Sequence, residues 1–111
     1  MIIPHFGHPP IPVNHRERTL DLKETGDFAW EIGKDGRRAI VIMLPDRAAK
    51  NLCSWVRFSI GWKNRNGYQW EWDGEERFPS LFPYIVAPGQ WQGVLTNGRL
   101  LEYNPHKKLI G

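Results

Sequence analysis

Apolar and polar residues alternate along most of the chain with the two-residue period of β-strands. In residues 27–44, three large apolar residues alternate with small or polar ones, the dipeptide Asp35-Gly36 follows, and a β-branched run leads up to Pro45. Asp-Gly is favoured in tight turns that need a positive φ, and proline is rare inside a central strand. The pattern therefore predicts a β-hairpin over residues 27–44 that ends before Pro45.

Two further hairpins are predicted downstream. Residues 55–62 and 68–72 both alternate, and Asn66-Gly67 lies between them as the turn. Residues 91–104 carry a second such dipeptide, Asn97-Gly98, between two apolar runs. Asn-Gly between alternating segments is the strongest short-range hairpin signal, so each pair is expected to form two antiparallel strands.

The remaining segments complete the predicted fold class. Pro79 and Pro83 place residues 78–86 along a sheet edge, because proline cannot donate to a strand ladder. Residues 46–52 carry the one helix signal, worth one or two turns, with Asp46 as its cap. No helix is long enough for a parallel crossover. We therefore expect an all-β fold, a single antiparallel sandwich or partly open barrel built from hairpins, with at most one short helix.

Residues 1–18 break the alternation and are predicted to form an irregular, proline-rich N-terminal arm ahead of a β domain over residues 19–111. Four prolines in the arm favour an extended path that the sheet does not need in order to close. Its large apolar side chains require a cover, so we expect the arm to contact a protein partner or a second copy of the chain. These candidate partner-binding residues are Ile2, Ile3, Phe6, Ile11 and Val13.

Composition narrows the class of protein. An apolar fraction of 41% with 24% charged residues in 111 residues is typical of one globular domain. The single cysteine, Cys53, cannot form an internal disulfide and indicates a reducing compartment. The chain lacks a signal-peptide pattern and a run of about 18 apolar residues. We expect no membrane partner, no secretion through a signal peptide, and a location in a host cytoplasm or a virion.

Neither catalysis nor cofactor binding is predicted. The chain has no nucleophile elbow, phosphate-binding loop, His-Glu-x-x-His or Cys-x-x-Cys motif. His5, His8 and His15 lie on the proline-rich arm, where their spacing fixes no coordination geometry, so no metal site is expected. Asp73 lies in a short acidic turn and is expected to bind its own turn backbone.

Tryptophan is abundant, and its placement raises the question of a ligand platform. Trp70 and Trp72 would share one face of the strand over residues 68–72. Aromatic residues paired across strands commonly stabilise small sheets, so both are interpreted first as core or half-buried residues.

The stretch WEWDGEERFPSLFPYI and, after a short turn, the stretch QWQGVLTNGRL resemble the signature of a small, uncharacterised all-β family common in tailed bacteriophages and bacteria. That family has a Trp-x-Trp-Asp-Gly element, then a Pro-Ser/Thr-x-x-Pro-Ser element, and then a Trp-His-Gly or Cys-His element that leads into a Thr/Ser-x-Gly turn. The matching positions here are residues 70–74, then Pro79, Ser80 and Pro83, then Trp91, Gly93, Leu95, Thr96, Asn97 and Gly98. The match covers about a third of the chain. It implies a phage or prophage origin and an all-β fold, and no particular activity.

The departures from that family concern its polar residues. Tyr84 stands where the family has a small hydroxyl residue, and Gln92 stands where a histidine is frequent. Many members have cysteines and a histidine gathered around the sheet like a metal site, and the matching region here has none of these ligands. The resemblance therefore implies no metal for this chain.

Two functions from different classes follow. The first is a small non-enzymatic phage or prophage protein that acts through protein contact, as a virion component or as an inhibitor of a host defence complex such as CRISPR. The alternative is a nucleic-acid-binding module, consistent with a net charge of +3. Its candidate residues are Arg37, Arg38, Arg57, Lys63 and Arg65 for phosphates and Trp62 for base stacking. Interspersed glutamates weaken this alternative, and a sugar- or phosphate-acting enzyme ranks last.

Overall fold

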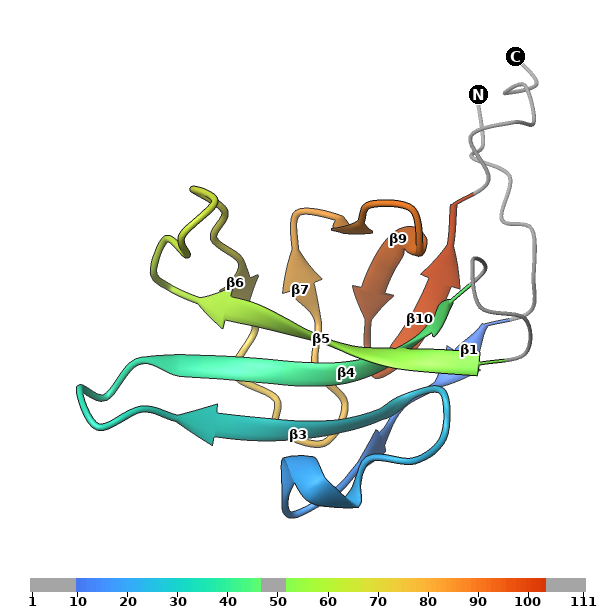
Figure 1. The fold of residues 1–111 in the computed structure, drawn as a ribbon, viewed down its shortest axis with the longest axis horizontal. Helices are drawn as coiled ribbons and strands as arrows, with labels where there is room; N and C mark the ends of the chain where they lie inside the picture. The colour runs from blue at the N-terminus through green and yellow to red at the C-terminus, as the bar shows by residue number, and fades with distance from the viewer. Residues whose placement is uncertain (1–9, 47–51, 104–111) are drawn as a thin grey trace.

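The computed structural model describes residues 10–46 and 52–103 and has the predicted all-β fold (Figure 1). It contains two four-stranded sheets and a two-stranded ribbon. The first sheet has the order β1-β10-β9-β8, formed by Ile11–Pro12, Arg99–Glu102, Trp91–Thr96 and Ile85–Ala87. The second sheet has the order β2-β3-β4-β5, formed by Asn14–His15, Asp27–Ile32, Arg38–Asp46 and Leu52–Ile60. The ribbon pairs β6 (Glu71–Trp72) with β7 (Leu81–Phe82), and a short 3₁₀ turn, η1, spans Thr19–Asp21.

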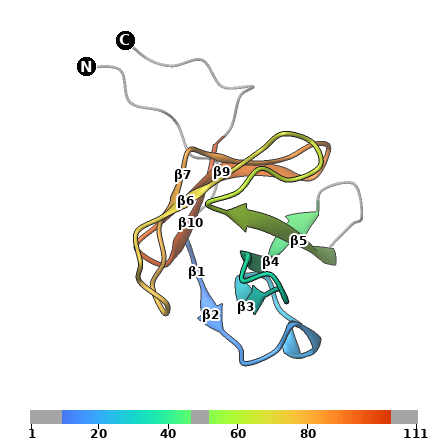
Figure 2. The ribbon, with the colours of Figure 1, turned by 90° about the vertical axis from the view of Figure 1, so that its left-hand side faces the viewer.

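The two sheets face each other, as Figure 2 shows from the side, and the core lies between them. Large apolar side chains from both sheets and from the ribbon form one buried cluster. Alternate residues of a strand point to opposite faces, so the period-two pattern of the sequence explains which side chains enter this cluster. Its members are Phe28, Ile40, Ile42, Leu44, Phe58, Trp70, Leu81, Ile85, Ala87, Trp91, Leu95 and Leu100.

The hairpin predicted over residues 27–44 is confirmed, with β3 antiparallel to β4. The expected end before Pro45 is wrong, because β4 continues to Asp46 and pairs there with β5. The O atom of Met43 accepts a hydrogen bond from Gly26 N, so Met43, and by alternation Pro45, direct their polar backbone groups away from β5. The missing N–H of proline therefore costs no bond of the β4–β5 ladder. The helix predicted over 46–52 falls mainly on residues 47–51, which lie outside the described residues.

The predicted boundary of the N-terminal arm at residue 18 needs correction. β1 pairs with β10 in the first sheet, and β2 pairs in parallel with β3 in the second. Ile11 and Val13, two of the residues expected to contact a partner, are half-buried and pack against the core of their own domain. Pro12 is tolerated in β1 because this short strand lies at the edge of its sheet. Ile2, Ile3 and Phe6, the other residues expected to contact a partner, lie outside the described residues.

The segment over residues 68–72 also differs from the prediction. The Asn66-Gly67 turn is present, since Gly67 N donates to Asn64 O, but no continuous strand returns along β5. Trp70 alone bridges Ile60, in parallel, and β6 then pairs with β7. Gly61 has a φ of +78°, so the chain leaves the line of β5 before the turn.

The last hairpin is confirmed over the described residues 91–103. β9 and β10 are antiparallel, and Asn97 and Gly98 form the two-residue turn with φ values of +49° and +72°. The edge position predicted for the proline-containing segment is confirmed for β8, which is the terminal strand of its sheet. The segment is not one extended strand, because it bends at Pro83 and its first part forms β7 in the ribbon. In the described part of the chain, no helix has the length and apolar character needed to cross a bilayer.

Candidate binding surfaces

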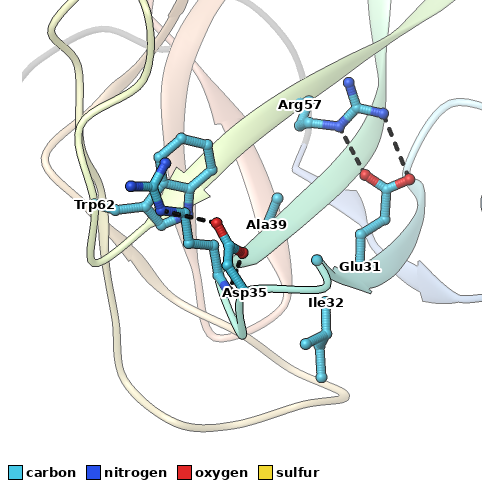
Figure 3. Close-up of a pocket in the computed structure, with 8 residues that line it drawn as sticks. Glu31, Ile32, Asp35, Ala39, Arg57 and Trp62 are labelled. Atoms are coloured by element: carbon cyan, nitrogen blue, oxygen red, sulfur yellow. Dashed lines mark hydrogen bonds and ion pairs between the residues drawn. The ribbon is translucent and has the colours of Figure 1, made fainter.

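One hollow lies on the outer face of the second sheet. Figure 3 shows the buried residue Ala39 between an ion pair on one side and a tryptophan on the other. The open hollow has a volume of about 560 Å³. Its lining residues are Glu31, Ile32, Gly33, Asp35, Arg37, Ala39, Arg57 and Trp62. We call it the Arg–Trp hollow.

One wall of the Arg–Trp hollow is formed by Trp62 and Arg37. The indole Nε1 of Trp62 donates a hydrogen bond to Arg38 O at 2.7 Å, which fixes the ring beside the β3–β4 turn. The guanidinium of Arg37 lies 5.0 Å from the centroid of that ring, and Asp35 Oδ2 lies 3.2 Å from Arg37 Nε. This is a cation–π stack with its cation held by a carboxylate.

The opposite wall is an ion pair. Arg57 donates from Nε to Glu31 Oε1 at 2.7 Å and from Nη2 to Oε2 at 3.4 Å, and the Thr19 hydroxyl also donates to Oε2. The hydrogen bond from Arg57 lowers the pKa of Glu31, and this effect outweighs the desolvation that raises it. Arg57 also stacks on Trp55, 5.3 Å from the ring centroid. The outer face of β5 thus carries one arginine–tryptophan stack, and the end of that strand carries a second.

The predicted nucleic-acid residues are only partly brought together. Arg37, Arg57 and Trp62 line the Arg–Trp hollow. Lys63 and Arg65 are exposed in the loop that follows Trp62 in the chain. Arg38 does not belong to this set. Its guanidinium lies 5.4 Å and 4.9 Å from the ring centroids of Trp30 and Trp72 on the other face of the sheet. Successive residues of a strand point to opposite faces, which separates Arg38 from its neighbour.

The second hollow lies beside β8 and is lined mainly by apolar side chains. Its volume is about 320 Å³. Trp70, which is 7% exposed, is its most buried lining residue and donates from Nε1 to Tyr84 O at 3.2 Å. Around it, Tyr68, Tyr84 and Val86 are 61%, 67% and 47% exposed. The remaining lining residues are Gln69, Pro83 and Pro88. We call this surface the β8 edge patch.

The backbone of the β8 edge patch is available for pairing. Gln92 O accepts a hydrogen bond from Tyr103 N, so the polar backbone groups of Gln92 point toward β10. Val86 lies opposite Gln92 across the β8–β9 ladder. The two therefore form a non-hydrogen-bonded pair on that side, and Val86 directs its N–H and C=O away from β9 toward the open edge.

The chain segment that contains this edge carries no charge. Residues 78–98 contain no charged side chain, in a chain of which 24% is charged. Proteins usually protect open sheet edges with charged residues, so an apolar, uncharged edge is typical of a contact surface. This uncharged stretch is the signal in the sequence that could have identified Tyr84 and Val86 as part of a contact surface.

The residues that carry the family resemblance have structural roles. Asp73 Oδ1 accepts hydrogen bonds from the N–H groups of Glu75 and Ser80, as predicted for its own turn. Ser80 Oγ in turn accepts from Asn97 N at 2.8 Å. Gly98 N donates to Pro79 O, so the loop after β6 is tied to the β9–β10 turn. The expectation that Trp70 and Trp72 are core or half-buried residues is also confirmed.

Metal-ligating side chains are dispersed in the described ranges 10–46 and 52–103. No three histidine, cysteine or acidic side chains there could share one ion. His15 lies against Phe28, with ring centroids 5.3 Å apart, and Cys53 Sγ lies 3.6 Å from Lys23 O. His5 and His8 lie outside the described residues.

Comparisons with known proteins add no family. No family model, curated protein or solved structure matches the chain. The resemblance to a phage family stays a prediction, and the two surfaces must be interpreted from their own chemistry.

Proposed function

We propose that this protein is a non-enzymatic binding protein that acts by contact with another protein, and that the β8 edge patch is the contact surface. The observation that carries the proposal is an open sheet edge beside an apolar hollow in a stretch without charges. An extended segment of a partner can add to such an edge by backbone hydrogen bonds and insert an apolar side chain into the neighbouring hollow.

The geometry limits the length of such a segment. Val86 offers both backbone groups to the edge, while Tyr84 O already accepts from Trp70. Pro83 and Pro88 bracket the strand and cannot donate. A partner segment of a few extended residues with one aromatic or branched apolar side chain fits these constraints. A second copy of this chain is the other occupant to be tested.

The expected biological setting is a phage or prophage, with the protein in a host cytoplasm or a virion. The residues that resemble the phage family support this setting. The order of neighbouring genes distinguishes the two roles. Tail or capsid genes beside this gene would favour a virion component, and early or defence-related genes would favour an inhibitor of a host defence complex such as CRISPR.

A photo-crosslinking amino acid in place of Tyr84 tests the contact surface in cells of the source organism. The matched control carries the same amino acid in place of Leu20, which is 83% exposed on η1. We expect a discrete adduct from position 84 that is lost when Val86→Arg is added, and no such adduct from position 20. Equal crosslinking from both positions, or none from position 84, would refute the proposed surface. Sedimentation of the purified chain identifies a second copy as the partner.

A further inference from the structure

The Arg–Trp hollow, which the proposed protein contact does not use, has the chemistry of a binding site for single-stranded nucleic acid. We infer that one base occupies the hollow against Trp62 and Arg37, that a second base stacks at Trp55, and that the strand runs along the outer face of β5. The juxtaposition that carries this inference is two arginine–tryptophan stacks on one sheet face with a hollow between them.

The first step of the argument concerns stacking. Aromatic rings and guanidinium planes are the surfaces on which unpaired bases stack. Trp55 is 53% exposed, so its ring is accessible to a ligand. Arg57 lies two residues along the strand, a spacing of about 7 Å, on the same face. Trp55 and Arg57 thus form one stacking surface on β5, and Trp62 and Arg37 form a second beyond the end of that strand, as a run of nucleotides requires.

The second step concerns hydrogen bonding. Of the five N–H groups of the Arg57 guanidinium, two donate hydrogen bonds to Glu31. No other residue that the structure describes accepts a hydrogen bond from this guanidinium. Glu31 therefore orients the guanidinium and leaves N–H groups for a phosphate or a base edge. On the other wall, the carboxylate of Asp35 can accept from the N–H groups of a base.

Charge determines which class of polymer fits better. Inside the hollow, Asp35 and Glu31 neutralise Arg37 and Arg57, so an acidic peptide would gain little attraction there. A base is neutral and gains from stacking instead. Exposed cations surround the hollow on the adjoining loops, where the phosphates of a strand would lie. They are Lys34, Lys63 and Arg65.

The test measures fluorescence anisotropy of labelled single-stranded DNA and RNA of about twelve nucleotides at about 50 mM salt. We expect binding that weakens with added salt. Trp55→Ala removes one stacking surface and is expected to weaken binding about tenfold. Arg57→Lys keeps the charge and removes the plane, and is expected to weaken binding by a similar factor.

Matched variants keep this test separate from the proposed protein contact. Tyr84→Ala alters the β8 edge patch alone and is expected to leave nucleic-acid binding unchanged. Circular dichroism of each variant monitors folding, since Trp55 and Arg57 are both exposed. No binding at low salt overturns the inference. So does binding that is indifferent to both Trp55→Ala and Arg57→Lys, or equally tight binding of a polyglutamate of matched charge.

Discussion

Asn14 donates a hydrogen bond from Nδ2 to Oδ1 of Asp27 at 3.3 Å, and Asp27 is buried, with 1% of its surface exposed. Oδ2 of the same carboxylate accepts from the N–H groups of Lys23 and Glu24 at 3.0 Å and lies 3.3 Å from Arg16 Nε. A buried carboxylate needs such partners. Asp27 therefore joins β2 to β3 and makes the residues after Val13 part of the domain.

The first prediction concerns this carboxylate. Burial raises the pKa of Asp27, but the hydrogen bonds from Glu24, Lys23 and Asn14 and the ion pair with Arg16 outweigh burial and hold the pKa below its ordinary value. Its contribution to stability is therefore present above the unfolded-state pKa of about 3.9 and is lost as the pH falls through the lower folded value. Asp27→Asn is expected to lower the free energy of unfolding at pH 7 by about 1–3 kcal/mol.

Urea denaturation at pH 7 and at about pH 3 measures both the cost of the substitution and its dependence on pH. The difference in free energy of unfolding between wild type and Asp27→Asn should narrow at the lower pH, because the unfolded wild-type chain takes up a proton at Asp27 more readily than the folded chain does. The matched control is Asp35→Asn, whose ion pair is exposed and whose effect is expected to stay within about 0.5 kcal/mol. A difference in free energy of unfolding of the same size at both pH values would contradict the lowered pKa of Asp27.

The second prediction reverses the expectation for the N-terminal arm. Deleting residues 1–12 removes β1, its ladder with β10 and the packing of Ile11 on the core. The truncation is therefore expected to lower the melting temperature by about 5 °C or more, instead of leaving it unchanged. Ile11→Ala with Val13→Ala in the full-length chain should reproduce part of the loss. A melting temperature unchanged in both proteins would show that the edge strand is dispensable.

The fold class and most hairpins were predictable because they depend on local signals. In β3 and β4, the alternating residues and the Asp35-Gly36 turn between them lie close together in the sequence. The same holds for β9 and β10 with the turn at Asn97-Gly98, so a short stretch of sequence is enough to predict each hairpin. The pairing of β2 with β3 was not predictable in this way. It depends on the buried side chain of Asp27, which reaches residues more than ten positions away. Likewise, a high density of prolines indicates an irregular path, but it does not show whether part of that segment forms an edge strand of the same domain.

The candidate surfaces were predictable only in part. Arg37, Arg57 and Trp62 were named together from their residue types, and the structure brings them to one hollow. Arg38 was wrongly grouped with them, because the turn sets which residue of β4 faces outward and the sequence does not fix that register. The β8 edge patch was missed, since openness of an edge depends on which strand ends its sheet.

The third prediction concerns metal. The purified, untagged protein is expected to carry no stoichiometric zinc or iron, because Cys53 is the sole cysteine and the ring of His15 packs on Phe28. Elemental analysis after dialysis against a metal-free buffer provides the measurement. A content of about one equivalent per chain would contradict the prediction and would direct attention to the histidines of residues 1–9.

The last prediction separates backbone strain from crowding at two turn glycines. Gly67 and Gly98 both have positive φ, at +84° and +72°, where a side chain is strained. A Cβ at Gly67 would meet no atom within 4 Å, whereas a Cβ at Gly98 would lie 2.9 Å from Phe78 Cα. Gly67→Ala is therefore expected to cost about 1 kcal/mol, and Gly98→Ala about 2–4 kcal/mol.

The added cost at Gly98 has a specific cause that can be measured. Gly98 N donates to Pro79 O and Gly98 O accepts from Val13 N, so displacing Phe78 loosens the loop after β6 and the N-terminal edge strand together. Equilibrium unfolding gives the two costs, and amide exchange should show faster exchange at Val13 and Gly98 in Gly98→Ala but not in Gly67→Ala. Equal costs for the two variants would mean that backbone strain alone restricts these positions, and that the contact with Phe78 relaxes without loss.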